Sequence, residues 1–142
     1  MGINGVTDSI TFVMDRASSE FKKLTNATLK TKVGITVEEF GALKTLCVRG
    51  EINQQELANT LLRERSSTKK LVDSCIRKNM VEKQDSPTNK KSALLVITSL
   101  GRDVVAEAET ILKAINQKLY RDISSDELAV VRKVCDKLLN HK

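Results

Sequence analysis

The sequence predicts a mainly α-helical protein with one small β-hairpin, and three observations carry this prediction. Aromatic residues make up only 3% of the 142 residues and Trp is absent, so Leu, Ile, Val and Ala must build the core, as suits packed helices. Capping signals mark the starts of several helices. One pair of short apolar runs, separated by turn-forming residues, predicts the hairpin. With 40% hydrophobic residues, the chain can form one domain without a metal or disulfide staple.

Three capping boxes predict helices that start at Thr36, Asn53 and Ser124. In each box a Glu follows three residues later, so that the cap side chain and the Glu side chain can satisfy each other's backbone N–H groups. An apolar residue precedes each cap and can act as a hydrophobic staple. The helix that starts at Thr36 is expected to stop at Gly50, a suitable C-terminal glycine, and the helix that follows Asn53 is expected to span about Gln54 to Leu61.

Long apolar stripes predict amphipathic helices at both ends of the chain. The first helix is expected from about Thr7 to Leu29, and another is expected to follow a cap at Thr98. The stripes comprise Ile10, Val13, Met14, Ala17, Phe21 and Leu24 in the first helix, Val104, Val105, Ala108, Ile111, Leu112, Ile115 and Leu119 in the second, and Leu128, Val131, Val134, Cys135 and Leu138 in the Ser124 helix. Stripes of this length need a partner, and a second copy of the chain is the simplest one. The alternative is that these helices fold back onto their own domain.

A basic helix and the hairpin occupy the middle of the chain. The helix is expected from about Arg65 to Lys78, and Asn79 can end it because Asn tolerates the left-handed conformation. The strands are expected at Met80–Lys83 and Ala93–Ile97, around a basic turn at 85–91, which places the wing at about 82–97. This order of helices followed by a hairpin predicts a winged helix-turn-helix.

The positive charge is concentrated in the same segment. The net charge is +6, and the stretch from Arg63 to Lys91 holds nine Lys or Arg against four acidic residues. Such a cluster is the footprint of a polyanion-binding protein, although a solvated charged face is the alternative interpretation. The predicted contacts with double-stranded DNA are Gln54, Arg65, Ser66, Ser67, Lys69, Lys70, Asn89, Lys90 and Lys91. Arg can pair with guanine in a bidentate way, Ser can donate or accept, and Lys suits phosphates.

Four segments resemble the MarR (multiple-antibiotic-resistance regulator) family of winged-helix repressors. They are Glu56-Leu57-Ala58, Leu71-Val72-Asp73, Lys78 to Lys83 and Leu94 to Arg102, in an ungapped register. The resemblance implies a single domain over 1–142, with a winged helix at 34–101 and dimerisation helices at 1–33 and 102–142. It also implies a homodimer that presents two recognition helices about 34 Å apart to a pseudo-palindrome. Family members are often released from DNA by a small-molecule effector or by cysteine oxidation.

Four positions depart from the family pattern. Asn89 and Lys91 stand in the wing where the family usually has Asp and Arg, so a bidentate Arg contact is lost there. Asn79 stands where Gly is usual. Glu64 stands where a Ser commonly caps the recognition helix, so either Ser66 takes over the capping or the first turn shifts.

Other classes of function find little support in the sequence. With one terminal His141 and no Gly-rich phosphate loop, neither an enzyme, a structural metal site nor a bound cofactor is expected. There is no membrane-spanning run or secretory signal, so a cytoplasmic location is expected. Cys47, Cys75 and Cys135 are interpreted as buried reduced thiols, with redox sensing as the alternative. A winged helix used for protein contacts is disfavoured, since the basic helix shows Ser, Lys and Arg and no apolar anchors.

Overall fold

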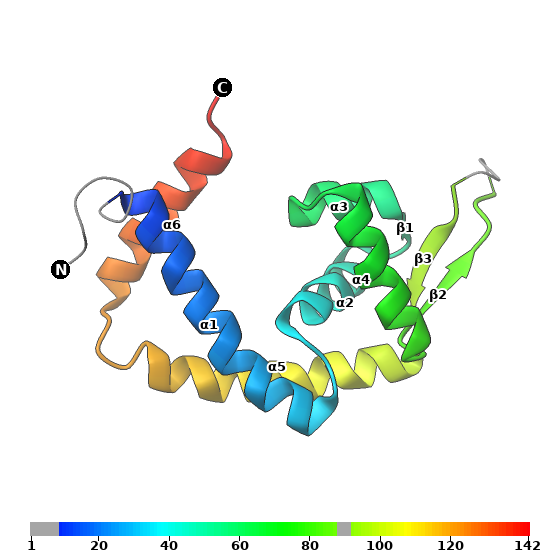
Figure 1. Cartoon of the computed structure of the whole chain (residues 1–142), viewed down its shortest axis with the longest axis horizontal. Coiled ribbons are helices and arrows are strands. Elements are labelled where there is room, and N and C mark those ends of the chain that lie inside the picture. The colour runs from blue at the N-terminus through cyan, green and yellow to red at the C-terminus, as the bar shows by residue number, and fades with distance from the viewer. Residues whose placement is uncertain (1–8, 88–91) are drawn as a thin grey trace.

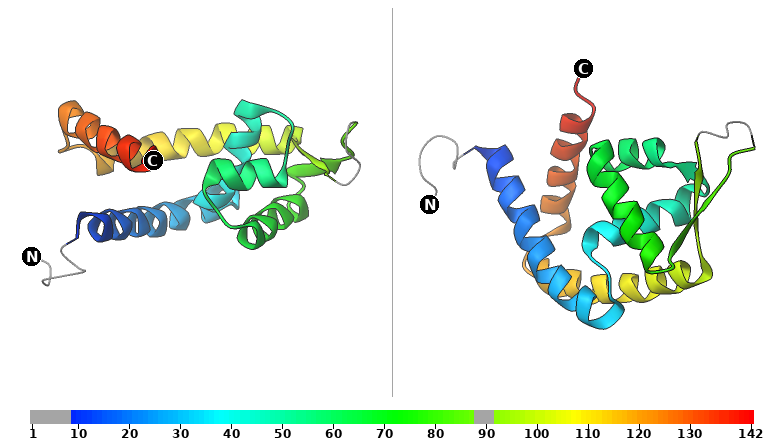
Figure 2. Two further views of the ribbon diagram at one scale, coloured as in Figure 1. Left: turned by 90° about the horizontal axis from the view of Figure 1, so that it is seen from above. Right: turned by 45° about the vertical axis from the view of Figure 1, so that its right-hand side comes forward.

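The computed structural model describes residues 9–87 and 92–142, and the predicted mainly α-helical fold with a small β-sheet is confirmed. The elements are α1 (Ile10–Val33), α2 (Val37–Arg49), β1 (Ile52–Asn53), α3 (Gln54–Leu61), α4 (Arg65–Arg77), β2 (Val81–Gln84), β3 (Leu94–Ile97), α5 (Ser99–Leu119) and α6 (Ser125–Leu139). Figure 1 shows α5 as a long base. A lobe of α2 to α4 with the sheet lies at one end of α5, and an arm made by α1 and α6 lies at the other, as both views of Figure 2 also show.

All three predicted capping boxes form, and they fix the starts of α2, α3 and α6. The Thr36 hydroxyl accepts from the Glu39 N–H at 3.0 Å, while the Glu39 carboxylate accepts from the Thr36 N–H at 2.9 Å. Thr98 caps α5 as expected, because its hydroxyl accepts from the Gly101 N–H at 3.0 Å. These bonds satisfy N–H groups that a helix leaves without an internal partner.

Several predicted boundaries were wrong by one to four residues. The first helix continues beyond Leu29 to Val33, because Gly34 adopts the left-handed conformation with φ of 71° and provides the terminating cap. The basic helix ends at Arg77, one residue early, and Asn79 takes the positive φ of 61° that was expected of it. Both wing strands start one residue later than predicted, at Val81 and Leu94.

The sheet has a third strand that the sequence did not reveal. Ile52 and Asn53 of β1 pair antiparallel with Leu95 and Leu94 of β3, which gives the strand order β1-β3-β2. Asn53 is at the same time the N-cap of α3, so its sequence signal is that of a helix start. The extra strand ties the start of α3 to the base of the wing.

The hydrophobic core joins the lobe to the base helix. Its fully buried members include Leu29, Ile35, Leu43, Leu46, Leu57, Val72, Leu95 and Ala108, which come from α1 to α5 and the sheet. Gly101 makes the close approach of α5 to the wing possible, because a Cβ there would clash with the Met80 carbonyl oxygen. Within residues 9–87 and 92–142, none of the helices combines the length and apolar character needed to cross a bilayer.

Candidate nucleic-acid interface

The start of α4 lies where the sequence predicted it, but its capping differs from the expectation. Glu64 is the N-cap, and its side chain accepts no capping hydrogen bond from the described residues. The alternative in which Ser66 takes over the capping is wrong, because Ser66 is the second residue of the helix and its backbone is already helical. Ser67 and Thr68 instead donate their hydroxyl protons to the Glu64 carbonyl oxygen, at 3.1 and 2.8 Å.

One face of α4 is polar and exposed, and the opposite face is in the core. Thr68, Leu71, Val72 and Cys75 are buried, whereas Arg65, Ser66, Lys69 and Lys70 are exposed and Ser67 is half-buried. At about 100° per residue, Ser66 lies opposite the middle of the buried face, with Lys70 beside it. Lys69 lies further toward one side of the exposed face, and Arg65 lies at the edge on that side. Five of the predicted contact residues therefore lie on or beside one surface.

This face carries an internal ion pair. The Lys69 Nζ lies 2.8 Å from a carboxylate oxygen of Asp73, one turn further along the helix. The hydrogen bond from Lys69 holds the pKa of the exposed Asp73 carboxyl below its ordinary value. The ammonium of Lys69 is therefore partly neutralised in the free protein, and a DNA phosphate would compete with Asp73 for it.

A buried carboxylate fixes the other end of α4 to α2. Glu39 is only 3% exposed, and besides its capping bond it accepts hydrogen bonds from Ser74 and from the Lys78 Nζ, the latter at 2.8 Å. Lys78 also donates to the Gly34 carbonyl oxygen at 2.8 Å, which adds the end of α1 to the network. Burial alone would raise the pKa of Glu39, but the bonds from Lys78, Ser74 and the Thr36 N–H outweigh it and lower the pKa.

The wing contributes a cation that the sequence analysis did not single out. Lys83 is exposed on β2, and together with Arg65 and Gln54 it lines a polar hollow between the starts of α3 and α4 and the sheet. Lys83 was counted within the basic segment, but no local pattern showed that it faces α4. The three predicted wing contacts, Asn89, Lys90 and Lys91, lie outside the described residues.

The cysteines do not form a reactive cluster in the part of the chain that the structure describes. Cys75 is in the core, and burial raises the pKa of its thiol to about 12. Cys47 and Cys135 are half-buried, unpaired thiols on α2 and α6. Across residues 9–87 and 92–142, no group of three or more His, Cys, Asp or Glu side chains is arranged to hold a metal ion.

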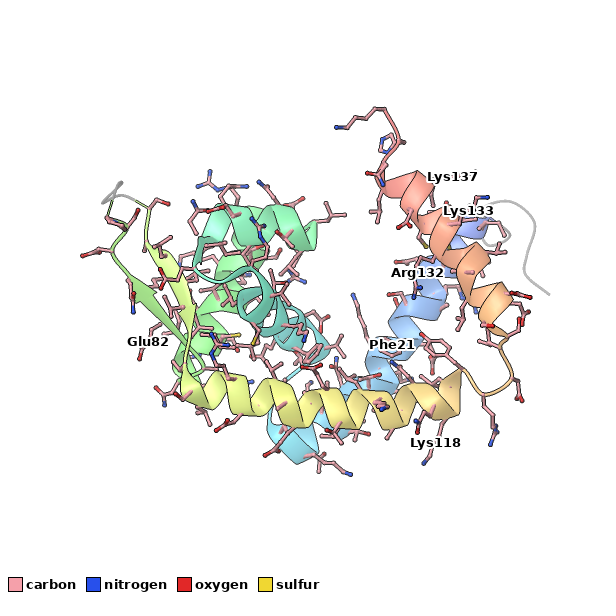
Figure 3. The ribbon with its side chains drawn as sticks, turned by 180° about the vertical axis from the view of Figure 1, so that it is seen from behind. Phe21, Glu82, Lys118, Arg132, Lys133 and Lys137 are labelled. Carbon is pink, nitrogen blue, oxygen red and sulfur yellow. The ribbon has the colours of Figure 1, made fainter. Side chains whose placement is uncertain are left out.

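The arm presents apolar side chains to solvent. In the described chain α6 buries none of its residues, and Val130 and Leu139 are 60% and 61% exposed. The other exposed apolar residues of the arm and the adjoining end of α5 are Ile10, Val13, Leu24, Leu119, Tyr120, Ile123, Val131, Val134 and Leu138. Figure 3 shows Arg132, Lys133 and Lys137 of α6 and Phe21 of α1 on this arm, far from Glu82 on the wing.

A second hollow lies between the lobe and the base helix. It has a volume of about 480 Å³ and is lined by Phe40 of α2 and by Leu112 and Asn116 of α5, among others. The side-chain oxygen of Asn116 is buried and accepts no hydrogen bond from the described residues. The remaining lining residues are Glu109, Lys113 and Gln117, so the hollow combines two apolar side chains with polar and charged groups.

In the lobe, α3 is followed by the exposed polar helix α4 and then by the β-wing, which is the architecture of a winged helix-turn-helix protein. Residues 33–92, which span α2 to β2, match the model of the MarR family. No curated protein sequence matches the chain.

Solved structures agree with the fold over nearly the whole chain. A mutant of E. coli MarR complexed with operator DNA has a TM-score of 0.82 at 21% identity, covering 89% of this chain and 91% of that one. CouR from Rhodococcus jostii, bound to p-coumaroyl-CoA, has a TM-score of 0.82 at 20% identity, over 99% and 98% of the chains. Bordetella bronchiseptica BpsR, described in a study of its regulation by 6-hydroxynicotinic acid, has a TM-score of 0.87 at 14% identity, over 99% and 100%.

Proposed function

We propose that this protein is a transcription regulator that binds double-stranded DNA through α4. The observation that carries the proposal is the exposed polar face of α4, formed by Arg65, Ser66, Lys69 and Lys70 and supported on a buried core. An α-helix with such a face fits the major groove of B-DNA, where polar side chains reach base edges and phosphates. The match of residues 33–92 to the MarR family model and the operator complex of E. coli MarR, which has the same fold, support the proposal.

The active species is a homodimer in this proposal. The lobe, about 34–101, binds one half-site, and the helices of 1–33 and 102–142 join the two copies. The exposed apolar residues of α1 and α6 support it, because a stable single chain seldom leaves so many large apolar side chains uncovered. Two copies related by a two-fold axis would suit a pseudo-palindromic operator with half-sites about one DNA turn apart.

Repression relieved by a small molecule is the mode of action that we propose. The support comes from neighbours in the fold, of which CouR is bound to p-coumaroyl-CoA and PcaV from Streptomyces coelicolor is in complex with its natural ligand. In this chain the hollow between α2 and α5 beside Phe40 and Asn116 offers space for such an effector. No step of this function requires catalysis by the protein.

Two other functions are less well supported. A cysteine switch on the DNA-facing helix α4 needs an accessible thiolate, whereas Cys75, the cysteine of α4, is buried and its raised pKa keeps the thiol protonated at neutral pH. The two half-buried cysteines, Cys47 and Cys135, lie on α2 and α6, outside the proposed DNA-binding face. A protein-interaction module would present apolar anchors on α4, whereas its exposed face consists of Ser, Lys, Arg and Asp.

The test is selection of bound fragments from a genomic library with the pure full-length protein at two salt concentrations. Enrichment of a pseudo-palindrome with half-sites about one turn apart, and binding that weakens steeply as salt rises, is the expected result. If no sequence is enriched at either salt concentration, with and without candidate organic acids, the protein is not a sequence-specific regulator.

A further inference from the structure

The polar hollow at the base of the wing has a composition that points to an anion. It has a volume of about 270 Å³, and its lining comes from β1, α3, α4, β2 and β3 and from the two residues before β3. The lining residues are Asn53, Gln54, Gln55, Arg65, Lys83, Ser92, Ala93 and Leu95. Among these described residues two are cations and none is acidic. The hollow is thus a small positive depression with amide and hydroxyl groups around it.

The two cations of this hollow are available for a ligand. Neither Arg65 nor Lys83 forms a hydrogen bond or a salt bridge with any residue that the structure describes, whereas Lys69 is paired with Asp73. The Oδ1 of Asn53 accepts from the Glu56 N–H at 2.8 Å, so that only the NH2 group of this side chain could donate to an anion. The strongest unsatisfied groups in the hollow are therefore a guanidinium and an ammonium, which favour phosphate oxygens.

The position of the hollow beside α4 indicates that this phosphate belongs to a DNA backbone. Arg65 lies at the edge of the exposed face of α4 that is next to the wing, and Lys83 approaches the same hollow from β2. A helix in the major groove is flanked by the two phosphate backbones, because the groove is only about 12 Å wide. The wing-side edge of α4 therefore faces a phosphate backbone, and its middle, around Ser66, faces the bases.

We propose that this hollow seats one DNA backbone phosphate in each half-site, held jointly by Arg65 and Lys83. The inference rests on the proposed function and assigns Arg65 a different role from the base-reading one that its chemistry alone suggested. Arg65 then fixes the register of α4 in the groove and supplies affinity without discriminating between bases. Lys83 becomes a DNA contact of equal importance, although it lies outside the helix and the tip of the wing.

The first test compares Arg65→Ala and Lys83→Ala with the wild type on a selected operator and on random DNA, across a salt series. Each variant is expected to lose affinity for both DNAs by the same factor, so that the ratio between them is unchanged. Each should also reduce the slope of log K against log salt by about 1 per protomer, which is about 2 for a dimer. Lys118→Ala is the matched control, since it removes the same charge from the far end of α5.

The second test locates the phosphate. Operators are made in which single phosphates are replaced by neutral methylphosphonates, one position at a time. At one symmetry-related position the replacement should weaken wild-type binding and have little further effect on Lys83→Ala or Arg65→Ala. The Lys118→Ala protein should respond to that replacement as the wild type does.

The outcomes separate this inference from the function on which it rests. If Arg65→Ala loses discrimination between operator and random DNA while the wild type binds its operator, Arg65 reads a base and the inference is wrong. The same conclusion follows if no single methylphosphonate position is coupled to Lys83. If the folded wild type binds no DNA in the selection, both the inference and the proposed function fail.

Discussion

The lobe and the arm of this molecule differ in how much of their apolar surface a single chain buries. In the lobe the core residues Leu43, Leu57 and Leu95 are fully buried, and a Glu39–Lys78 ion pair closes the contact between α2 and α4. In the arm, as far as the structure describes it, α6 buries no residue at all. Helices with similar amphipathic patterns are therefore buried to different degrees in the two regions. The lobe buries its apolar residues within one chain, whereas the arm leaves many of its apolar residues exposed, as the proposed dimer would explain.

The largest effect is expected from a charge placed in the exposed apolar stripe of the arm. Val131→Asp places a charge in the exposed apolar stripe of α6, and burying an unpaired carboxylate between two copies is strongly unfavourable. We expect the dimer to dissociate into folded monomers and the affinity for a full pseudo-palindrome to fall by at least about 100-fold. Light scattering and binding titrations measure the two effects. Lys133→Asp, on the same helix but outside that stripe, is the control and should remain dimeric.

A smaller effect is expected from breaking the lobe at Glu39. Glu39→Gln removes a buried charge that binds Lys78, Ser74 and the Thr36 N–H, and should lower the free energy of unfolding by about 1–3 kcal/mol at neutral pH. Light scattering should show an unchanged dimer. Glu38→Gln, which alters a weak ion pair at 4.0 Å with Lys22, is the control.

The pH dependence sharpens the same prediction. Because the pKa of Glu39 is lowered in the folded protein, its contribution is complete above the ordinary pKa and is lost as pH falls through the lowered folded value. The difference between wild type and Glu39→Gln in urea unfolding should therefore be full at pH 7 and shrink in acid below about pH 4. A difference that stays constant down to pH 2.5 would exclude an ionised Glu39 as the source of the stability.

A modest effect is expected on the DNA-facing surface of the lobe. Asp73→Asn releases the Lys69 ammonium and removes a negative charge from α4. DNA affinity should rise by about threefold, with a steeper salt dependence, since exposed pairs are worth only about 0.2–1 kcal/mol. Unchanged or weaker binding on both operator and random DNA would show that Asp73 itself contacts the DNA or positions Lys69 for it.

The smallest effect is expected from thiol chemistry. The buried Cys75 thiol should react with maleimide only as fast as the lobe unfolds, because its raised pKa leaves almost no thiolate at pH 7.5. Mass spectrometry after timed labelling measures the rate at each cysteine. Fast labelling of Cys75 in the folded protein, with loss of DNA binding, would revive the redox-sensing alternative.

The parts of the fold that could be predicted from sequence are those that depend on nearby residues. The capping boxes at Thr36, Asn53 and Ser124 were predictable because each bond joins residues three positions apart. The third strand was not, since β1 becomes a strand only by pairing with β3, more than 40 residues away.

In the candidate site, too, the features that depend on nearby residues could be predicted, and those that depend on packing between distant segments could not. The polar face of α4 follows from the helical period, so the positions of Arg65 and Lys69 on it were predictable. The approach of Lys83 to Arg65 depends on how the wing packs beside α4, and no pattern within β2 encodes it. The network of Glu39 with Lys78 was hidden for the same reason, although the capping role of Glu39 was visible.

The most direct test of the division between lobe and arm is to measure the affinity of wild type and Val131→Asp for a full pseudo-palindrome and for a single half-site. We expect both proteins to bind the half-site equally, because the lobe is complete in one chain, and only the wild type to gain from the second half-site. Equal binding of the full site by both proteins, or loss of half-site binding by a folded Val131→Asp monomer, would contradict the account.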